Sequence, residues 1–137
     1  MKEGLMVLGH GVDLIDVARI ERMLTEHGDR FREKVFTEAE RAYAEAGGRR
    51  RGERYAARFA AKEAAFKALG TGWRSGIAWT DAEVVHGADG APILRVHGEF
   101  ARIAGERGVT RWCLSITHTD TLAMASVLAG REPAVAG

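Results

Sequence analysis

The sequence is poor in the residues that mark several classes of protein. It has one cysteine, Cys113, which excludes an intramolecular disulfide and fits a reducing compartment. The formal net charge is only +1, so the chain as a whole carries no field that would attract nucleic acid or an acidic membrane. The apolar run at residues 5–8 is too short for a membrane span or a signal peptide. These absences predict a cytoplasmic protein with neither a membrane nor a nucleic-acid partner.

What is present fits a small enzyme-sized domain. The 137 residues are 46% hydrophobic and 28% charged, which is enough for one core of ordinary size. We expect a single domain over residues 1–137, with loose tails at 1–4 and 130–137 and a flexible connection at the glycine- and arginine-rich segment 47–52.

Helix signals dominate the first half of the chain. A buried strand is expected at residues 5–14, and Asp16 can cap a helix that runs to about residue 26, with Gly28 as its stop. Thr37 and Glu40 have the spacing of a capping box for a second helix. The alanine-rich stretch 53–69, closed by Gly70, predicts one long helix.

The second half has the pattern of antiparallel strands. Strands are expected at residues 79–86 and 92–96 around a turn at 88–90, then a short helix at 99–106 closed by Gly108. A final strand pair is expected at 112–117 and 122–128. The predicted fold class is α+β, an antiparallel sheet packed against one long helix.

Two carboxylates are expected at positions whose surroundings are apolar, which is unusual for a charged side chain. Glu63 falls at the edge of the aromatic stripe of the long helix, four residues before Lys67. Taken alone, this is more often an ordinary helix ion pair. Asp13 lies near the end of an apolar strand, although it could also cap the turn after that strand. Together, Asp13 and Glu63 are the kind of ligands that Mg²⁺ prefers, with water and phosphate oxygens completing the shell.

Other candidates are weak when taken alone. His118, after Thr117, could bond a phosphate oxygen or be a plain turn histidine. Gly70 and Thr71 could cradle a phosphate, but a simple helix cap is more common. Arg19, Arg22 and Met23 lie on one side of the first helix and suit an acidic helical partner, or form an ordinary exposed face.

Three motifs, in this order, resemble those of the small bacterial phosphopantetheinyl transferases that modify acyl carrier protein. They are Gly11-Val12-Asp13-Leu14 with Arg19-Ile20, then Arg58-Phe59-Ala60-Ala61-Lys62-Glu63-Ala64 with Lys67-Ala68-Leu69-Gly70, and Ser115-Ile116-Thr117-His118-Thr119. The segments Trp79-Thr80-Asp81-Ala82-Glu83-Val84 and Gly90-Ala91-Pro92 also fit. The resemblance covers nearly the whole chain, from Gly11 to about Leu128.

The resemblance implies a 4′-phosphopantetheinyl transferase-like fold and a Mg²⁺-dependent transfer of phosphopantetheine from coenzyme A to a serine of acyl carrier protein, for fatty acid or polyketide synthesis. Adenosine 3′,5′-bisphosphate would leave. It implies catalytic and metal roles for Asp13 and Glu63, and a catalytic role for Lys67. The partner face would be Arg19, Arg22 and Met23, and the protein would be a homotrimer with sites between subunits. The residues implied to line the coenzyme A site are Arg58, Lys62, Gly70, Thr71, Pro92, Thr117 and His118.

Two other functions remain open on the residues alone. A metal-dependent nucleotide hydrolase would use the same carboxylates without a carrier-binding surface. A non-catalytic module could bind an acidic polymer through Arg49, Arg50 and Arg51. The sequence does not determine which carrier proteins are modified, whether the metal is Mg²⁺ or Mn²⁺, or which acylated forms of coenzyme A are accepted. It also leaves open whether Asp13 acts as the general base directly or through a water.

Overall fold

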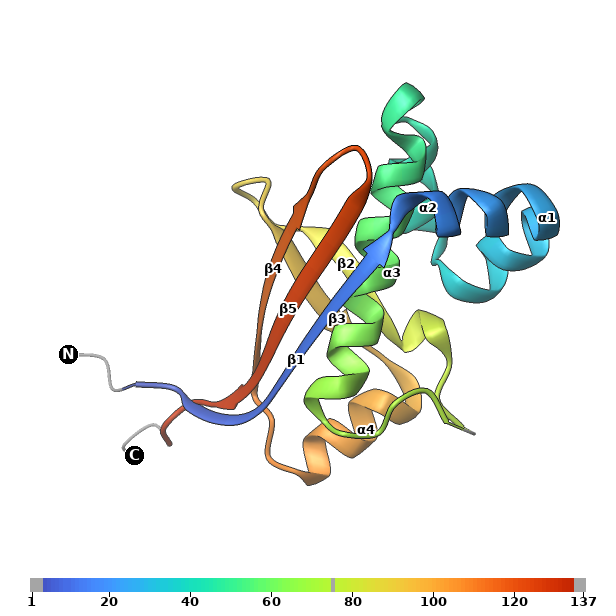
Figure 1. Ribbon diagram of the computed structural model, residues 1–137. Coiled ribbons are helices and arrows are strands. Elements are labelled where there is room, and N and C mark those ends of the chain that lie inside the picture. The colour runs from blue at the N-terminus through green and yellow to red at the C-terminus, as the bar shows by residue number, and fades with distance from the viewer. Residues whose placement is uncertain (1–3, 75, 135–137) are drawn as a thin grey trace.

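The computed structural model describes residues 4–74 and 76–134 (Figure 1). The predicted tail residues 1–3 and 135–137 lie outside this part of the chain. Two short 3₁₀ turns, η1 (Gly48–Arg50) and η2 (Trp79–Asp81), join the larger elements. These are β1 (Met6–Asp16), α1 (Val17–Val35), α2 (Glu38–Glu45), α3 (Arg51–Ala68), β2 (Ala82–His86), β3 (Pro92–Val96), α4 (Gly98–Glu106), β4 (Arg111–His118) and β5 (Leu122–Arg131).

The strands form two antiparallel sheets around α3, which confirms the predicted α+β class. One sheet has the order β1-β5-β4, and β2 and β3 form a separate hairpin. Helix α3 packs against both β1 and β5 and also contacts β2 (Figure 1). Helices α1 and α2 lie together at one end of α3, and α4 lies near the other end. The long helix is therefore the central element, and side chains on its different faces meet different neighbours.

Small residues allow α3 to lie close to the sheet. Ala56, Ala60, Ala64 and Ala65 are fully buried in the helix. Across from it, a Cβ on Gly11 would lie 1.9 Å from the Ala64 carbonyl oxygen, and one on Gly9 would meet Ala68 in the same way. Any larger residue at either glycine would push the strand away from the helix. The Gly-His-Gly segment before Asp13 therefore sets the distance between Asp13 and α3.

Helix α1 is longer than predicted. Gly28 interrupts it with φ 49°, a conformation in which glycine is favoured, but the chain resumes its helical path and ends at Val35. The restart buries Phe31 and Val35 in the core, so packing outweighs the local stop signal. The predicted capping box of α2 is confirmed, because the Thr37 hydroxyl accepts from the Glu40 amide and the Glu40 carboxylate accepts from the Thr37 amide.

Three other local predictions differ from the structure. Residues 47–52, predicted to be a flexible connection, form η1 and the first turn of α3, with Gly52 buried against Glu21. Residues 79–81, predicted to begin a strand, form η2. Residues 130 and 131, predicted to be a loose tail, still pair with β1 through Val7 and Met6.

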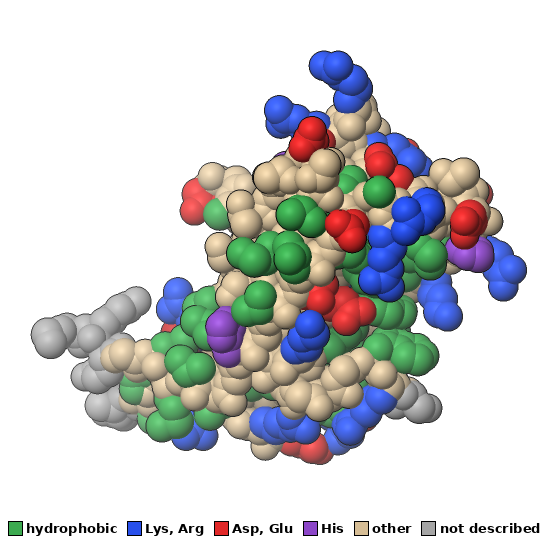
Figure 2. Space-filling view, in the orientation of Figure 1, with side chains coloured by type: hydrophobic (Ala, Val, Ile, Leu, Met, Phe, Trp, Pro, Cys, Tyr) green, Lys and Arg blue, Asp and Glu red, His purple; other side chains and the backbone are tan. Residues whose placement is uncertain are grey.

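Strand β1 is buried on one face only, which corrects the expectation of a buried strand. It is an edge strand, and its outward side chains Val12 and Leu14 are 43% and 61% exposed. Leu122 and Met124 of β5 are exposed as well, and Figure 2 shows hydrophobic side chains along the strands of this sheet. Among the described residues, no helix is both long and apolar enough to cross a membrane.

Candidate active site

The structure brings the two predicted carboxylates together with Lys67. Asp13, on the helix-facing side of β1, accepts a hydrogen bond of 3.1 Å from the Lys67 ammonium. The same ammonium donates to the Val12 carbonyl oxygen, also at 3.1 Å. The side chain of Asp13 is 15% exposed and that of Lys67 is 51% exposed. Lys67 can therefore exchange Asp13 for a phosphate group of a bound ligand without moving the helix.

Glu63 lies close enough to Asp13 for the two negative charges to interact. Burial raises the pKa of the Glu63 carboxyl, and the charge of Asp13 raises it further, while Lys67 and Arg19 oppose this rise. A half-buried carboxylate beside a second carboxylate is stabilised when a cation joins them. The described residues hold no cluster of three or more potential metal-ligating side chains. Two carboxylates nevertheless fit Mg²⁺, which keeps several waters and takes phosphate oxygens as further ligands.

A second group lies around Arg58 on another face of α3. Arg58 is 4% exposed, and burial lowers the pKa of its guanidinium. Its Nη2 lies 3.5 Å from His86 Nε2, and its guanidinium carbon lies 4.0 Å from the centre of the Tyr43 ring. Pro92 pairs with His86 across the β2–β3 hairpin. Arg58 Nε is buried and has no hydrogen-bond partner within the described chain, so this group is a candidate anion site.

His118 and Thr117, predicted to line one site, lie on opposite faces of β4. His118 pairs with the buried Ala123, whereas Thr117 pairs with the exposed Met124. His118 Nδ1 lies 3.0 Å from a carboxylate oxygen of Glu53, in the first turn of α3. Glu53 and Glu63 are ten residues apart on one helix, a distance of about 15 Å along its axis. Within one chain, His118 is therefore well separated from the two carboxylates.

The structure contradicts the predicted phosphate contact of Lys62. Its side chain is fully buried, and its ammonium donates to Glu40 and to the Ala82 carbonyl oxygen, both at 2.7 Å. Glu40 also accepts from the amides of Thr37 and Val84. Lys62 faces α2 and β2 while its neighbour Glu63 faces β1, because adjacent helix residues point about 100° apart. Lys62 belongs to the core and not to a ligand site.

Gly70 and Thr71 close the C-terminus of α3. Gly70 has φ 68°, and both the amide and the hydroxyl of Thr71 donate to the Phe66 carbonyl oxygen. This is the helix cap that the sequence allowed as the plain alternative. If Gly70 and Thr71 contact a phosphate, they must do so while keeping the hydrogen bonds of this cap.

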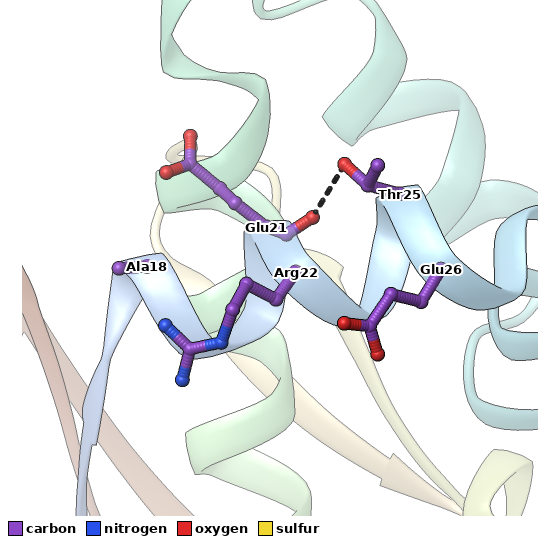
Figure 3. Close-up of a pocket in the computed structure, with 5 residues that line it drawn as sticks. All are labelled: Ala18, Glu21, Arg22, Thr25 and Glu26. Atoms are coloured by element: carbon purple, nitrogen blue, oxygen red, sulfur yellow. Dashed lines mark hydrogen bonds between the residues drawn. The ribbon is translucent and has the colours of Figure 1, made fainter.

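The first half of α1 carries the predicted partner face. Arg19 and Arg22 are exposed, whereas Met23 is half-buried and packs against the core. A hollow of about 360 Å³ on this helix is lined by Glu21, Arg22 and Glu26, with Ala18 and Thr25. Figure 3 shows the basic side chain of Arg22 and the acidic side chains of Glu21 and Glu26 projecting from this stretch of the helix. Arg19 also acts electrostatically on Glu63, so it borders the carboxylate site. The surface is thus mixed in charge rather than uniformly basic.

Comparison with known proteins defines the class. Residues 9–125 match the family model described as the 4′-phosphopantetheinyl transferase superfamily. This range contains Asp13, Glu63, Lys67 and His118. The chain therefore belongs to the 4′-phosphopantetheinyl transferase superfamily.

Within that superfamily, the chain is similar to holo-[acyl-carrier-protein] synthases. The synthase of Solibacter usitatus is 50% identical over 123 residues, which cover 90% of this chain and 98% of the relative. A crystal structure of the Bacillus anthracis synthase in complex with CoA (3′,5′-ADP) has a TM-score of 0.75 at 38% identity, covering 93% of this chain and 99% of that one. The Neisseria meningitidis synthase has a TM-score of 0.82 at 31% identity, covering 90% and 98%. These likenesses confirm the predicted family, fold and enzyme class.

Several residues around these sites were missed by sequence reasoning. Glu53 gave no signal because its partner His118 is distant in sequence. Tyr43 and His86 meet Arg58 only through the packing of α2 and the β2–β3 hairpin against α3. Glu40 could be recognised as the second residue of a capping box, but that pattern predicts only where the helix begins.

Proposed function

We propose that this protein transfers the 4′-phosphopantetheine group of coenzyme A to a serine of apo-acyl carrier protein and releases adenosine 3′,5′-bisphosphate. The observation that carries the proposal is the close approach of Asp13, Glu63 and Lys67, which the family motifs contain. The reaction supports fatty acid or related polyketide synthesis. We expect the protein to act in the cytoplasm.

Each residue of the group has a role that suits phosphoryl transfer. The serine oxygen attacks the phosphorus that bears the pantetheine, and its proton passes to Asp13, directly or through a water. Lys67 holds the phosphates and can give a proton to the leaving group. Asp13 and Glu63 would hold Mg²⁺, which neutralises the diphosphate when bound. Half-burial of the two carboxylates keeps their charges effective, because less water screens them.

The remaining coenzyme A contacts fall on other faces of the molecule. Arg58 offers a buried guanidinium with an unused Nε, beside Pro92 and His86. His118, Thr117, Gly70 and Thr71 complete the proposed set. Because Thr117 and His118 lie on opposite faces of β4, one chain is poorly arranged to surround a single coenzyme A molecule. This spread supports a site completed by a second subunit.

A homotrimer would cover the exposed face of the three-stranded sheet. Val12, Leu14, Leu122 and Met124 form an apolar outer surface on β1 and β5, with one hydrogen-bonded pair between His10 and Ser126. An exposed apolar surface of this kind usually marks a contact with another protein. We place the subunit interface there.

The direct test is a mass measurement. Apo-acyl carrier protein incubated with coenzyme A, Mg²⁺ and the enzyme should gain the mass of one phosphopantetheine group on its serine. A nucleotide hydrolase would instead break down coenzyme A and leave the carrier unchanged. A binding module acting through Arg49, Arg50 and Arg51 would do neither.

Changing Met124 to glutamate should separate the subunits. Met124 is on the central strand and points away from α3, so the new charge would be buried in the interface but exposed in a monomer. Light scattering should report a mass near 14.9 kDa for the variant and three times this value for the wild type. Ile93→Glu, at a site 43% exposed on the other sheet, is the control and should stay trimeric. A fully active monomeric wild type would exclude the trimer.

Changing Arg22 to glutamate should weaken carrier binding selectively. Carrier proteins of this type are acidic, so a like charge on the docking face should raise the KM for carrier by about tenfold or more. The KM for coenzyme A should stay the same, and the rise of the carrier KM with salt should become smaller. Arg22 is a cleaner probe than Arg19, which also acts on Glu63. Arg49→Glu is the matched variant, and a stronger effect there would place docking on that loop.

A further inference from the structure

The segment between α3 and η2 exposes a tryptophan side chain. The chain has three tryptophans, and Trp73 is the most exposed of them, at 50%. Four residues later, Ile77 is buried in the core, and its amide donates to the Arg74 carbonyl oxygen at 3.0 Å. The segment is therefore anchored on the core side, while the indole of Trp73 faces outward.

The Trp73 ring is the outer end of a row of stacked aromatic rings. Its centre lies 6.3 Å from that of Trp79, with an angle of 14° between the ring planes. Trp79 in turn stacks on Phe59, with 5.1 Å between the ring centres. Phe59 lies four residues before Glu63 on α3, so the row leads outward from the carboxylate site. A ring held by stacking loses little conformational freedom when it contacts a partner, which favours binding.

Positive charge accompanies the exposed ring. Lys34, in the last turn of α1, is exposed, and its ammonium lies 6.0 Å from the centre of the Trp73 ring. Arg74, the next residue of the chain, is exposed as well. The acidic side chain that acts on Arg74 is Glu99, which already accepts two hydrogen bonds from Arg102, at 2.6 and 2.7 Å. The surface beside Trp73 is therefore apolar and basic.

Helix α1 connects this surface with the docking face proposed above. Arg19, near its beginning, acts electrostatically on Glu63, and Lys34 lies near its end, beyond the bend at Gly28. The turn η2 contacts α1, and Figure 1 shows the chain between α3 and η2 on the same side of α3 as α1. The proposed trimer interface uses other elements, because it lies on the outer face of the three-stranded sheet. A partner that lies along α1 would reach both Arg19 and Trp73.

We propose that Trp73 and Lys34 form a second contact with the carrier protein, in which the exposed indole meets an apolar side chain and the ammonium pairs with an acidic side chain of the same carrier helix. This rests on the proposed function and adds two residues outside the family motifs of this chain. An acidic amphipathic helix presents both kinds of side chain within one turn, which suits an apolar ring beside an ammonium. The contact lies away from the reacting groups and sets affinity and choice of carrier.

A carrier that lacks its reactive serine separates docking from reaction. Calorimetric titration of the intact protein with this carrier, in the absence of coenzyme A, should give a dissociation constant about tenfold higher for Trp73→Ala than for the wild type. Lys34→Glu should raise it by a similar factor at low salt and by much less at high salt, whereas the effect of Trp73→Ala should persist. The dissociation constant for coenzyme A should stay at the wild-type value in both variants.

Matched variants keep the test valid if Trp73→Ala disturbs the packing of Trp79. Lys34→Glu leaves the aromatic row intact, and Arg111→Glu, at an exposed position of β4, makes the same change of charge and should bind the carrier as the wild type does. In a set of carriers with one acidic helix residue at a time changed to lysine, one should bind Lys34→Glu more tightly than it binds the wild type. With a carrier that has no tryptophan, binding should change the tryptophan emission of the wild type, and Trp73→Phe should remove most of this change.

The outcomes separate this inference from the proposed function. If the wild type modifies the carrier but Trp73→Ala and Lys34→Glu both bind it normally, the second contact does not exist. A loss of coenzyme A affinity with normal carrier binding would assign Trp73 to the cofactor, and a loss of trimer mass would assign it to the subunit interface. Either result would overturn the inference and leave the proposed function in place. If the wild type does not modify the carrier, the proposed function itself is wrong, and the inference falls with it.

Discussion

Replacing Glu63 by glutamine should lower turnover by at least about 100-fold at saturating coenzyme A, carrier and Mg²⁺. The amide has nearly the same shape as the carboxylate but no charge, so it cannot share a cation with Asp13. The half-buried position makes the charge effective, since burial and Asp13 together raise the pKa of Glu63 and a cation would offset both effects. Steady-state kinetics with excess Mg²⁺ provides the measurement.

The stability of the Glu63→Gln variant should be equal to or greater than that of the wild type. Removal of a charge that burial and Asp13 both disfavour relieves a cost in the metal-free protein. Denaturation in the absence of metal checks this second result. Glu106→Gln, on the exposed end of α4, is the matched control and should keep full turnover. Turnover of Glu63→Gln close to the wild-type value would remove Glu63 from the reaction.

Local signals predicted most elements because the residues that end them act locally. The capping box at Thr37 and the glycine after Leu69 each satisfy backbone groups of their own helix. Gly28 misled the prediction because its effect depends on the next residues of the chain, where Phe31 and Val35 gain burial when the helix resumes. The arginines of segment 47–52 resemble a solvated loop, but Gly52 lets Glu21 of α1 pack against the start of α3.

The site was predictable where a residue's own segment gives a chemical reason for it. Asp13 and Glu63 come from different elements and different motifs, but each could be singled out as a carboxylate on an apolar element, and the family motifs contain both. Lys62 was misplaced because neither its helix position nor its motif tells which neighbour its face meets. That neighbour is Glu40, 22 residues earlier, and only the packing of α2 on α3 brings it there. The same limit hid Glu53, whose partner comes from the far end of the chain.

Changing Lys62 to methionine should destabilise the fold by about 3–5 kcal/mol without a specific loss of coenzyme A affinity. The ammonium is fully buried and bonded to Glu40 and to the Ala82 carbonyl oxygen. Its removal leaves a buried carboxylate without a positive partner and a carbonyl oxygen without a donor. Urea denaturation gives the loss of stability, and the KM for coenzyme A of the remaining folded enzyme should equal that of the wild type. A raised KM with unchanged stability would restore Lys62 to the phosphate site.

A second substitution at Glu40 tests whether charge is the source of this loss. In Lys62→Met, adding Glu40→Gln removes the unpaired charge and keeps an amide oxygen that can accept from the Thr37 or Val84 amide. The double variant should therefore be more stable than Lys62→Met by about 1–3 kcal/mol, although Glu40→Gln alone should destabilise the wild type. The effect of Glu40→Gln on stability should thus change sign when Lys62 is already replaced by Met, which is expected only if the two side chains interact directly in the core. Because Glu40 contacts α2, α3 and β2 at once, the pair also sets how α3 is rotated between the two sheets. If the two losses of stability simply add, the pair does not act as one unit, and the rotation of α3 that presents Glu63 to Asp13 must come from the close packing of Gly9 and Gly11 alone.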